Sequence, residues 1–109
     1  MKVCDIAEKL SLKPLSVVDS SREVTGAYIG DLLSWVMGRA ESGDAWITIM
    51  SNINIVAVAS LADVACIILA EGVVPDENVC ATALQKGINI YTSDKTAYVL
   101  ATELAQCLQ

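Results

Sequence analysis

The chain has 109 residues, of which 54% are hydrophobic, so we expect one domain over residues 1–109 with an apolar core rather than a disordered chain. It contains no histidine and no phenylalanine, which removes the commonest general base and transition-metal ligand and leaves the core to aliphatic side chains. Seven basic and thirteen acidic residues give a formal charge of −6, which argues against binding to nucleic acids or to anionic membrane surfaces.

The first third of the chain is predicted to form a helix and two short strands. Apolar residues recur at helical spacing over residues 3–10, and Pro14 prevents that helix from continuing. Short apolar or β-branched runs predict strands over residues 15–18 and 23–29. Gly26 interrupts the second strand, as is typical of a bulge or a close backbone approach.

Helices and strands alternate from residue 31 onward. The predicted elements are a helix capped by Asp31 and ended by Gly43, a strand over 45–49, a helix capped by Asn54, a strand over 64–69, a helix that starts at residues 75–77 with Asp76 as cap and ends at Gly87, a strand over 88–92, and a helix capped by Ser93 or Asp94. This alternation implies right-handed crossovers between parallel strands. We therefore predict a three-layered α/β domain, in which a mostly parallel sheet of about five strands has helices on both faces.

Residues 45–62 contain no charge and are long enough to cross a membrane as a helix. Ser51, Asn52 and Asn54 in the middle of this stretch favour a strand, a turn and a short helix instead. The first residues also lack the apolar segment of a signal peptide. We therefore expect a cytoplasmic protein with no membrane association.

The four cysteines are Cys4, Cys66, Cys80 and Cys107, and no two of them form a C-x-x-C pair. We expect them to be reduced, buried, small hydrophobic residues, with a disulfide, a metal site or a reactive thiol as the alternatives. We predict no metal site and no cofactor.

No motif in the sequence predicts catalysis. The glycine-rich phosphate-binding loops are absent, and a nucleophilic triad has no histidine available. Ser93 with Lys95, and Asp76 with Glu77, are explained by helix starts. We therefore expect no catalytic residues and no enzyme activity.

Polar residues follow three of the predicted parallel strands. In an open parallel sheet, ligands bind outside the carboxyl ends of the strands, next to helix N-termini whose amides can hold an anion or a carbonyl group. The candidate ligand-binding residues at these strand ends are Thr48, Asn52, Asn54, Glu71, Gly72, Thr92, Asp94 and Thr96. The alternative is that these side chains only cap their own helices.

The apolar fraction is high for a chain of this length, which predicts that some apolar surface is covered, most simply by a second copy. Trp35 lies next to Val36 and off the inner stripe of its predicted helix. Trp35 is therefore a candidate interface residue of a homodimer, together with Tyr28.

Four segments follow, in order, a pattern known from one family: SREVTGAYIGDLL at 21–33, TIMSNINIVAVA at 48–59, AEGVVPD at 70–76 and TSDKTAY at 92–98. Together they resemble the signature blocks of the DRTGG domain over essentially the whole chain. The chain departs from the family pattern at Ser21, where an aspartate is expected, and at Ala27 and Glu71, where glycines are expected. We add Thr25 and Gly26, from the first segment, to the candidate ligand-binding residues.

The resemblance implies an α/β fold similar to the N-terminal domain of HPr kinase/phosphorylase. DRTGG domains accompany CBS domains in pyrophosphatases and occur in long phosphotransacetylases, as regulatory and dimerising modules. The resemblance thus implies a non-catalytic, homodimeric regulatory or ligand-sensing domain with a small-molecule effector. Stand-alone copies in anaerobic bacteria accompany iron-only hydrogenase and redox-signalling genes, so the alternative is a protein-interaction subunit of a redox or hydrogenase-associated assembly.

Overall fold

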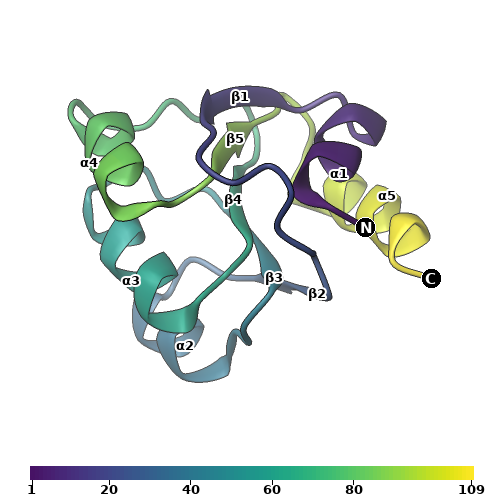
Figure 1. Cartoon of the computed structure of the whole chain (residues 1–109), viewed down its shortest axis with the longest axis horizontal. Coiled ribbons are helices and arrows are strands. Elements are labelled where there is room, and N and C mark those ends of the chain that lie inside the picture. The colour runs from purple at the N-terminus through teal and green to yellow at the C-terminus, as the bar shows by residue number, and fades with distance from the viewer.

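The computed structural model describes residues 1–109 and contains one five-stranded sheet between two layers of helices (Figure 1). The strands are β1 (Lys13–Ser16), β2 (Gly26–Ile29), β3 (Asp44–Thr48), β4 (Cys66–Leu69) and β5 (Ile90–Thr92), in the spatial order β1-β5-β4-β3-β2. The pairs β2–β3, β3–β4 and β4–β5 are parallel, and β1 pairs with β5 in the antiparallel direction. The predicted α/β class and mostly parallel sheet are confirmed.

The helices divide between the two faces of the sheet. They are α1 (Val3–Lys9), α2 (Leu33–Arg39), α3 (Asn54–Ala62), α4 (Val79–Lys86) and α5 (Ala97–Cys107). Because successive side chains of a strand point to opposite faces, Ile47 and Ile68 pack under α1 and α5. Trp46 and Ile67 belong to the core on the other face. Helices α2, α3 and α4 cover that face (Figure 1). Each face thus has its own apolar core.

The central strands β3 and β4 are buried along their whole length, as continuous apolar runs in a parallel sheet require. The uncharged stretch 45–62 is divided between β3 and α3, with a turn between them. None of the helices combines the length and the apolar character needed to cross a membrane.

Strand β1 begins two residues earlier than predicted and includes Pro14, which pairs with Tyr91. Proline lacks the N–H that a central strand needs, but an edge strand tolerates it because one side of its backbone has no partner. Val17 and Val18, predicted to belong to this strand, are instead partly exposed in the loop that follows it.

Helices α4 and α5 start later than predicted, because other residues precede or cap them. The Asp76 amide donates to the Ser51 carbonyl oxygen at 2.8 Å, and Ser51 Oγ donates to Asp76 Oδ1 at 3.1 Å, so Asp76 lies in a loop ahead of α4. Thr96, rather than Ser93 or Asp94, caps α5 by accepting a hydrogen bond from the Val99 amide.

The glycine predictions at the helix ends have different outcomes. Gly87 ends α4 with φ +74°, as predicted. The predicted stop at Gly43 is wrong, because α2 ends at Arg39 and Gly43, with φ +87°, belongs to the turn that enters β3.

Asn89 is a buried polar residue that the sequence patterns do not single out. Its Oδ1 accepts hydrogen bonds from the amides of Val18 and Asp19, at 2.8 and 3.0 Å. Its Nδ2 donates to the carbonyl oxygens of Asp19 and Ala65, at 2.8 and 3.0 Å. Asn89 therefore fastens the loop after β1 to the strands β4 and β5.

The prediction of four buried thiols is wrong for three of them. All four cysteines are free, but only Cys66 is buried, while Cys80 and Cys107 are partly buried and Cys4 is exposed. Burial raises the pKa of the Cys66 thiol to about 12, so this thiol stays protonated and unreactive at neutral pH.

Candidate functional site

The carboxyl ends of β2, β3, β4 and β5 meet at one edge of the sheet, which we call the carboxyl edge. Because β1 runs antiparallel to β5, the start of β1 at Lys13 lies at the same edge. The predicted ligand-binding residues in the loops at this edge are Thr48, Asn52, Asn54, Glu71, Gly72, Thr92, Asp94 and Thr96.

Thr48 joins the end of β3 to the loop after β2. Its Oγ1 donates to Asp31 Oδ1 at 2.8 Å, and the Ile49 amide donates to the same oxygen at 3.0 Å. Thr48 Oγ1 also accepts from the Met50 amide at 3.2 Å. Asp31, predicted to cap α2, therefore holds two neighbouring strand ends together instead, and Leu32 is the residue at the N-cap of α2.

Asn52 and Asn54 lie at the start of α3. The Asn54 amide donates to Asn52 Oδ1 at 2.9 Å, so Asn52 closes a local turn ahead of the helix. Asn54, predicted to be the cap, is the first helical residue, and its exposed side chain makes no hydrogen bond within the protein.

Glu71 and Gly72 form a tight turn after β4, with φ values of +61° and +71°. Their amides donate to the carbonyl oxygens of Lys95 and Ser93, at 2.9 and 2.8 Å, which fixes this turn against the loop after β5. A Cβ atom at residue 72 would lie 3.0 Å from Asp94 Oδ1. Both the φ value and this close approach favour glycine at position 72.

Thr92, Asp94 and Thr96 end β5 and precede α5. Thr92 Oγ1 donates to the Val73 carbonyl oxygen at 3.0 Å, and the Thr96 hydroxyl caps α5. The Asp94 carboxylate is exposed and lies 3.7 Å from Lys13 Nζ. The threonine hydroxyls thus serve the local structure, while Asp94 faces solvent.

The carboxyl edge is acidic. Asp31, Glu71, Asp76 and Asp94 all lie in its loops, and Lys13 already pairs with Asp94. Negative potential from these carboxylates opposes an anion at the helix N-termini. The side chains left for a ligand therefore favour a neutral or cationic group over a phosphate.

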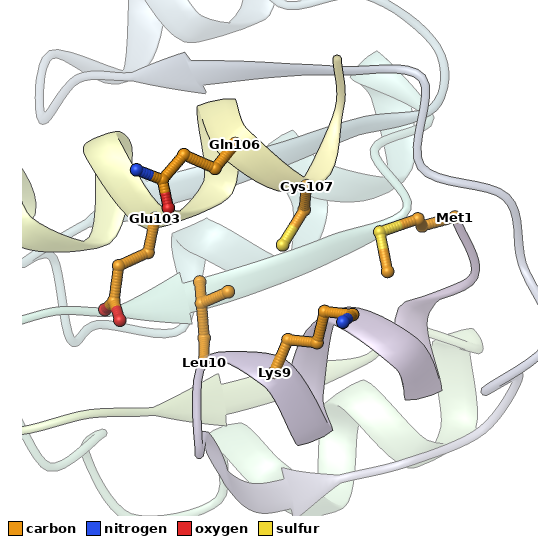
Figure 2. Close-up of a pocket in the computed structure, with 6 residues that line it drawn as sticks. All are labelled: Met1, Lys9, Leu10, Glu103, Gln106 and Cys107. Carbon is orange, nitrogen blue, oxygen red and sulfur yellow. The ribbon is translucent and has the colours of Figure 1, made fainter.

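Neither of the two hollows in the surface is centred on the carboxyl edge. The first, of about 400 Å³, lies between α1 and α5 and is lined by Met1, Lys9, Leu10, Glu103, Gln106 and Cys107 (Figure 2). Two of its lining residues are bonded to Lys95, whose Nζ donates to Glu103 Oε1 and to the Leu10 carbonyl oxygen, at 2.8 and 3.0 Å. The second lies between α3 and α4, and Asn54 is the one predicted ligand-binding residue that lines either hollow.

Thr25 and Gly26 lie at the opposite edge of the sheet, where the parallel strands begin, and so do not join the other candidates. Gly26 pairs with Asp44 at the start of β3, and a Cβ atom on Gly26 would lie 2.7 Å from Asp44 Oδ1. The Thr25 amide donates to the Gly43 carbonyl oxygen at 3.0 Å. These contacts give both residues a structural role in the entry to β2.

An ion-pair network supports this opposite edge. Arg22 Nη1 lies 3.1 Å from Asp63 Oδ1, and Arg22 Nη2 donates to the Asp63 carbonyl oxygen at 2.9 Å. Ser42 Oγ donates to the second carboxylate oxygen of Asp63. Hydrogen bonds from Ser42 and then Arg22 lower the pKa of the Asp63 carboxyl below its ordinary value. The network joins the entry to β2, the turn before β3 and the end of α3.

The two candidate interface residues differ in their surroundings. Trp35 is 51% exposed, and the Arg39 guanidinium carbon lies 3.7 Å from the centre of its ring. Tyr28 is partly buried and packs against the core under α2, with its ring close to Gly30. Trp35 is therefore available to a partner, whereas Tyr28 mainly fills the core.

Comparison with known proteins shows similarity at the level of the fold. No family model matches the chain, and no curated protein matches it. The solved structure of the CBS and DRTGG domains of the regulatory region of a Clostridium perfringens pyrophosphatase, in complex with its activator diadenosine tetraphosphate, superposes with a TM-score of 0.72 at 14% sequence identity. The superposition covers 96% of this chain and 46% of that one, so this chain spans about half the length of its structural neighbour. The chain therefore shares its fold with part of a regulatory region that contains CBS and DRTGG domains.

Proposed function

We propose that this chain is a non-catalytic regulatory module that forms a homodimer through β2 and α2 and responds to a small molecule at the carboxyl edge. The proposal rests on three exposed apolar side chains, Ile29 of β2, Leu32 of the loop after it and Trp35 of α2, which together we call the β2–α2 patch. Its three side chains are 50%, 56% and 51% exposed. The shared fold with a regulatory region supports the regulatory part of the proposal.

The two edge strands of the sheet, β1 and β2, differ in how their unpaired backbone groups are protected. Edge strands leave backbone groups unpaired, and proteins protect them with charged residues or proline. Strand β1 carries Lys13 and Pro14, whereas β2 has the sequence GAYI, with neither a charge nor a proline. An unprotected edge beside exposed apolar side chains is typical of a surface that a partner covers. A second copy is the simplest partner, because it presents the same patch.

Trp35 is the expected anchor of this dimer. Tryptophan and arginine are enriched among interface residues that contribute most to affinity, and Arg39 already holds the Trp35 ring in place. Replacing Trp35 with alanine is expected to cost about 2 kcal/mol, or roughly thirtyfold in the dimer Kd. Sedimentation velocity across micromolar concentrations measures this change.

Leu84→Ala is the matched control, because Leu84 is 54% exposed on α4, which contacts β1 at the far side of the sheet. Equal dimer Kd values for Trp35→Ala and the parent protein would contradict the proposal. A monomeric protein that forms a stable complex with a native redox or hydrogenase subunit would favour the interaction-subunit alternative.

The small-molecule part of the proposal has a separate test. A thermal-shift screen of nucleotides and metabolites is expected to give a ligand whose NMR shift changes map to residues 48–54, 71–75 and 92–96. The acidic surroundings predict that neutral or cationic compounds give larger shifts than phosphates. Absence of any ligand in the screen, or mapping to another surface, would contradict this part.

A further inference from the structure

The hollow between α3 and α4, which we call the α3–α4 groove, has features of a ligand site that is centred on these two helices rather than on the carboxyl edge. Its volume is about 380 Å³, within the range of small-molecule pockets. Val56 is 2% exposed and forms an apolar floor of the groove. Ile53 and Leu61 are exposed apolar side chains in the lining of the groove. The groove lies on the face of the sheet opposite α1 and α5.

The polar lining residues come from both helices, and Asn54 lies at the Ile53 end of the groove. Thr82 and Lys86 are four residues apart on α4, so they share one face of that helix. Both α3 and α4 connect neighbouring parallel strands, so they run in the same direction along the sheet (Figure 1). Their C-terminal turns therefore bring Ser60 and Lys86 to the same end, away from Ile53.

The charge of the groove differs from that of the rest of the molecule. The chain has thirteen acidic residues, yet none of them lines the groove. Lys86 is its one charged lining residue and, like Lys2, Lys9 and Arg39, takes part in none of the ion pairs. The groove thus combines apolar walls with a cation that has no carboxylate partner.

We propose that the α3–α4 groove binds a small amphipathic organic anion, such as a medium-chain carboxylate. The hydrocarbon part packs along Val56 and Ile53, and the carboxylate lies at the ammonium group of Lys86. The Ser60 and Thr82 hydroxyl groups and the Asn54 side-chain amide are the other side-chain donors in the lining. This site lies on α3 and α4, outside the β2–α2 patch, and it shares only Asn54 with the candidate residues of the carboxyl edge.

Lys86 must supply the preference for an anion. The C-terminal ends of helices have partial negative charge, and the whole protein has a net charge of −6, so both oppose an anion at this position. Removing the ammonium group is therefore expected to remove the preference for an anion while leaving apolar binding in place.

Titration with octanoate, octan-1-ol and octylamine, followed by amide NMR shifts, tests the proposal. Octanoate is expected to shift amides over residues 53–61 and 82–86 and to bind several-fold more tightly than octylamine. Lys86→Met is expected to weaken octanoate binding about three- to fivefold, as the loss of a solvent-exposed ion pair does, and to leave octan-1-ol binding unchanged.

Lys9→Met is the matched control, because it removes the same charge from α1 on the opposite face of the sheet. It is expected to leave octanoate binding unchanged. The proposal is overturned if octylamine binds as tightly as octanoate, if Lys86→Met has no effect, or if the shifts map to the hollow between α1 and α5. Absence of octanoate binding at millimolar concentration also overturns it.

Discussion

At the scale of single residues, Asn89 illustrates how a buried polar side chain stabilises a loop. It makes four hydrogen bonds to backbone groups, and three of them hold Val18 and Asp19. A buried backbone group that loses its partner costs free energy on the order of 1–3 kcal/mol. Asn89 therefore links the loop after β1 to the core.

Replacing Asn89 with alanine is expected to lower the free energy of unfolding by about 3 kcal/mol, because two amides and two carbonyl groups lose a partner. Urea denaturation measures this loss. Asn54→Ala is the control, because Asn54 is exposed, and it is expected to change the stability by less than about 0.5 kcal/mol. Similar stability of the two variants would show that the Asn89 contacts contribute little.

The lowered pKa of the Asp63 carboxyl implies that the stability of the folded protein depends on pH. The folded-state pKa of Asp63 is lowered below 3.8 by Ser42 and Arg22, so its contribution to stability is present above the unfolded-state value. That contribution is lost as the pH falls through the folded-state pKa. Because the Asp63 side chain is 61% exposed, solvent screens the ion pair and keeps its contribution small.

The variant Asp63→Asn is expected to be less stable than the parent protein at pH 7, and the difference is expected to shrink as the pH is lowered below 3.8. Asparagine tolerates the φ of +57° at this position, so the variant tests the charge rather than the backbone. Urea midpoints at several pH values measure the difference, with Glu77→Gln as an exposed control. A difference that stays constant with pH would contradict this assignment.

At the scale of elements, the parallel part of the fold follows from local patterns in the sequence. The apolar runs that form β3 and β4, and the alternation from residue 31 onward, are sufficient to predict the parallel part of the sheet. The capping residues are less predictable, because Asp31 and Asp76 can bond either to their own helix or to a neighbouring loop. The fold brings Thr48 to Asp31 and Ser51 to Asp76, and these distant partners determine where the helices begin.

The candidate site could also be predicted only in part, because strand direction follows from local patterns whereas pairing with distant segments does not. Strand direction predicts that residues after β3, β4 and β5 share one edge, and they do. Thr25 and Gly26 lie in the first part of the predicted strand 23–29. Because β2 starts at Gly26, both residues lie at the amino end of this strand, at the opposite edge of the sheet. The antiparallel direction of β1, which brings Lys13 to the carboxyl edge, depends on pairing with the distant strand β5 and has no local signal.

The turn that enters β3 gives a prediction at this scale. Gly43 has φ +87°, and a Cβ atom there would overlap with Thr25 Oγ1, whereas Gly38 lies in α2 with open space around it. Gly43→Ala is expected to destabilise the protein by about 2 kcal/mol, and Gly38→Ala to stabilise it by roughly 0.5–1 kcal/mol. Thermal unfolding of the two variants measures these opposite changes. Changes of the same sign would contradict the assigned turn.

At the scale of the whole molecule, one protected and one unprotected edge strand are expected to determine how copies of the chain associate. Strand β1 meets solvent with Lys13 and Pro14, while β2 lies beside the β2–α2 patch. A chain with two such different edge strands is expected to pair through β2 alone and to stop at two copies. Closure at two copies is compatible with the free carboxyl edge and the free α3–α4 groove.

The most direct test is the molar mass in solution, measured by sedimentation equilibrium on the parent protein and on Ile29→Lys, which places a charge in the edge strand. We predict twice 11.5 kDa for the parent protein at micromolar concentration and 11.5 kDa for Ile29→Lys, with both proteins folded. A parent protein with the mass of one chain, or a variant that remains a dimer, would contradict the claim that β2 and α2 form the interface.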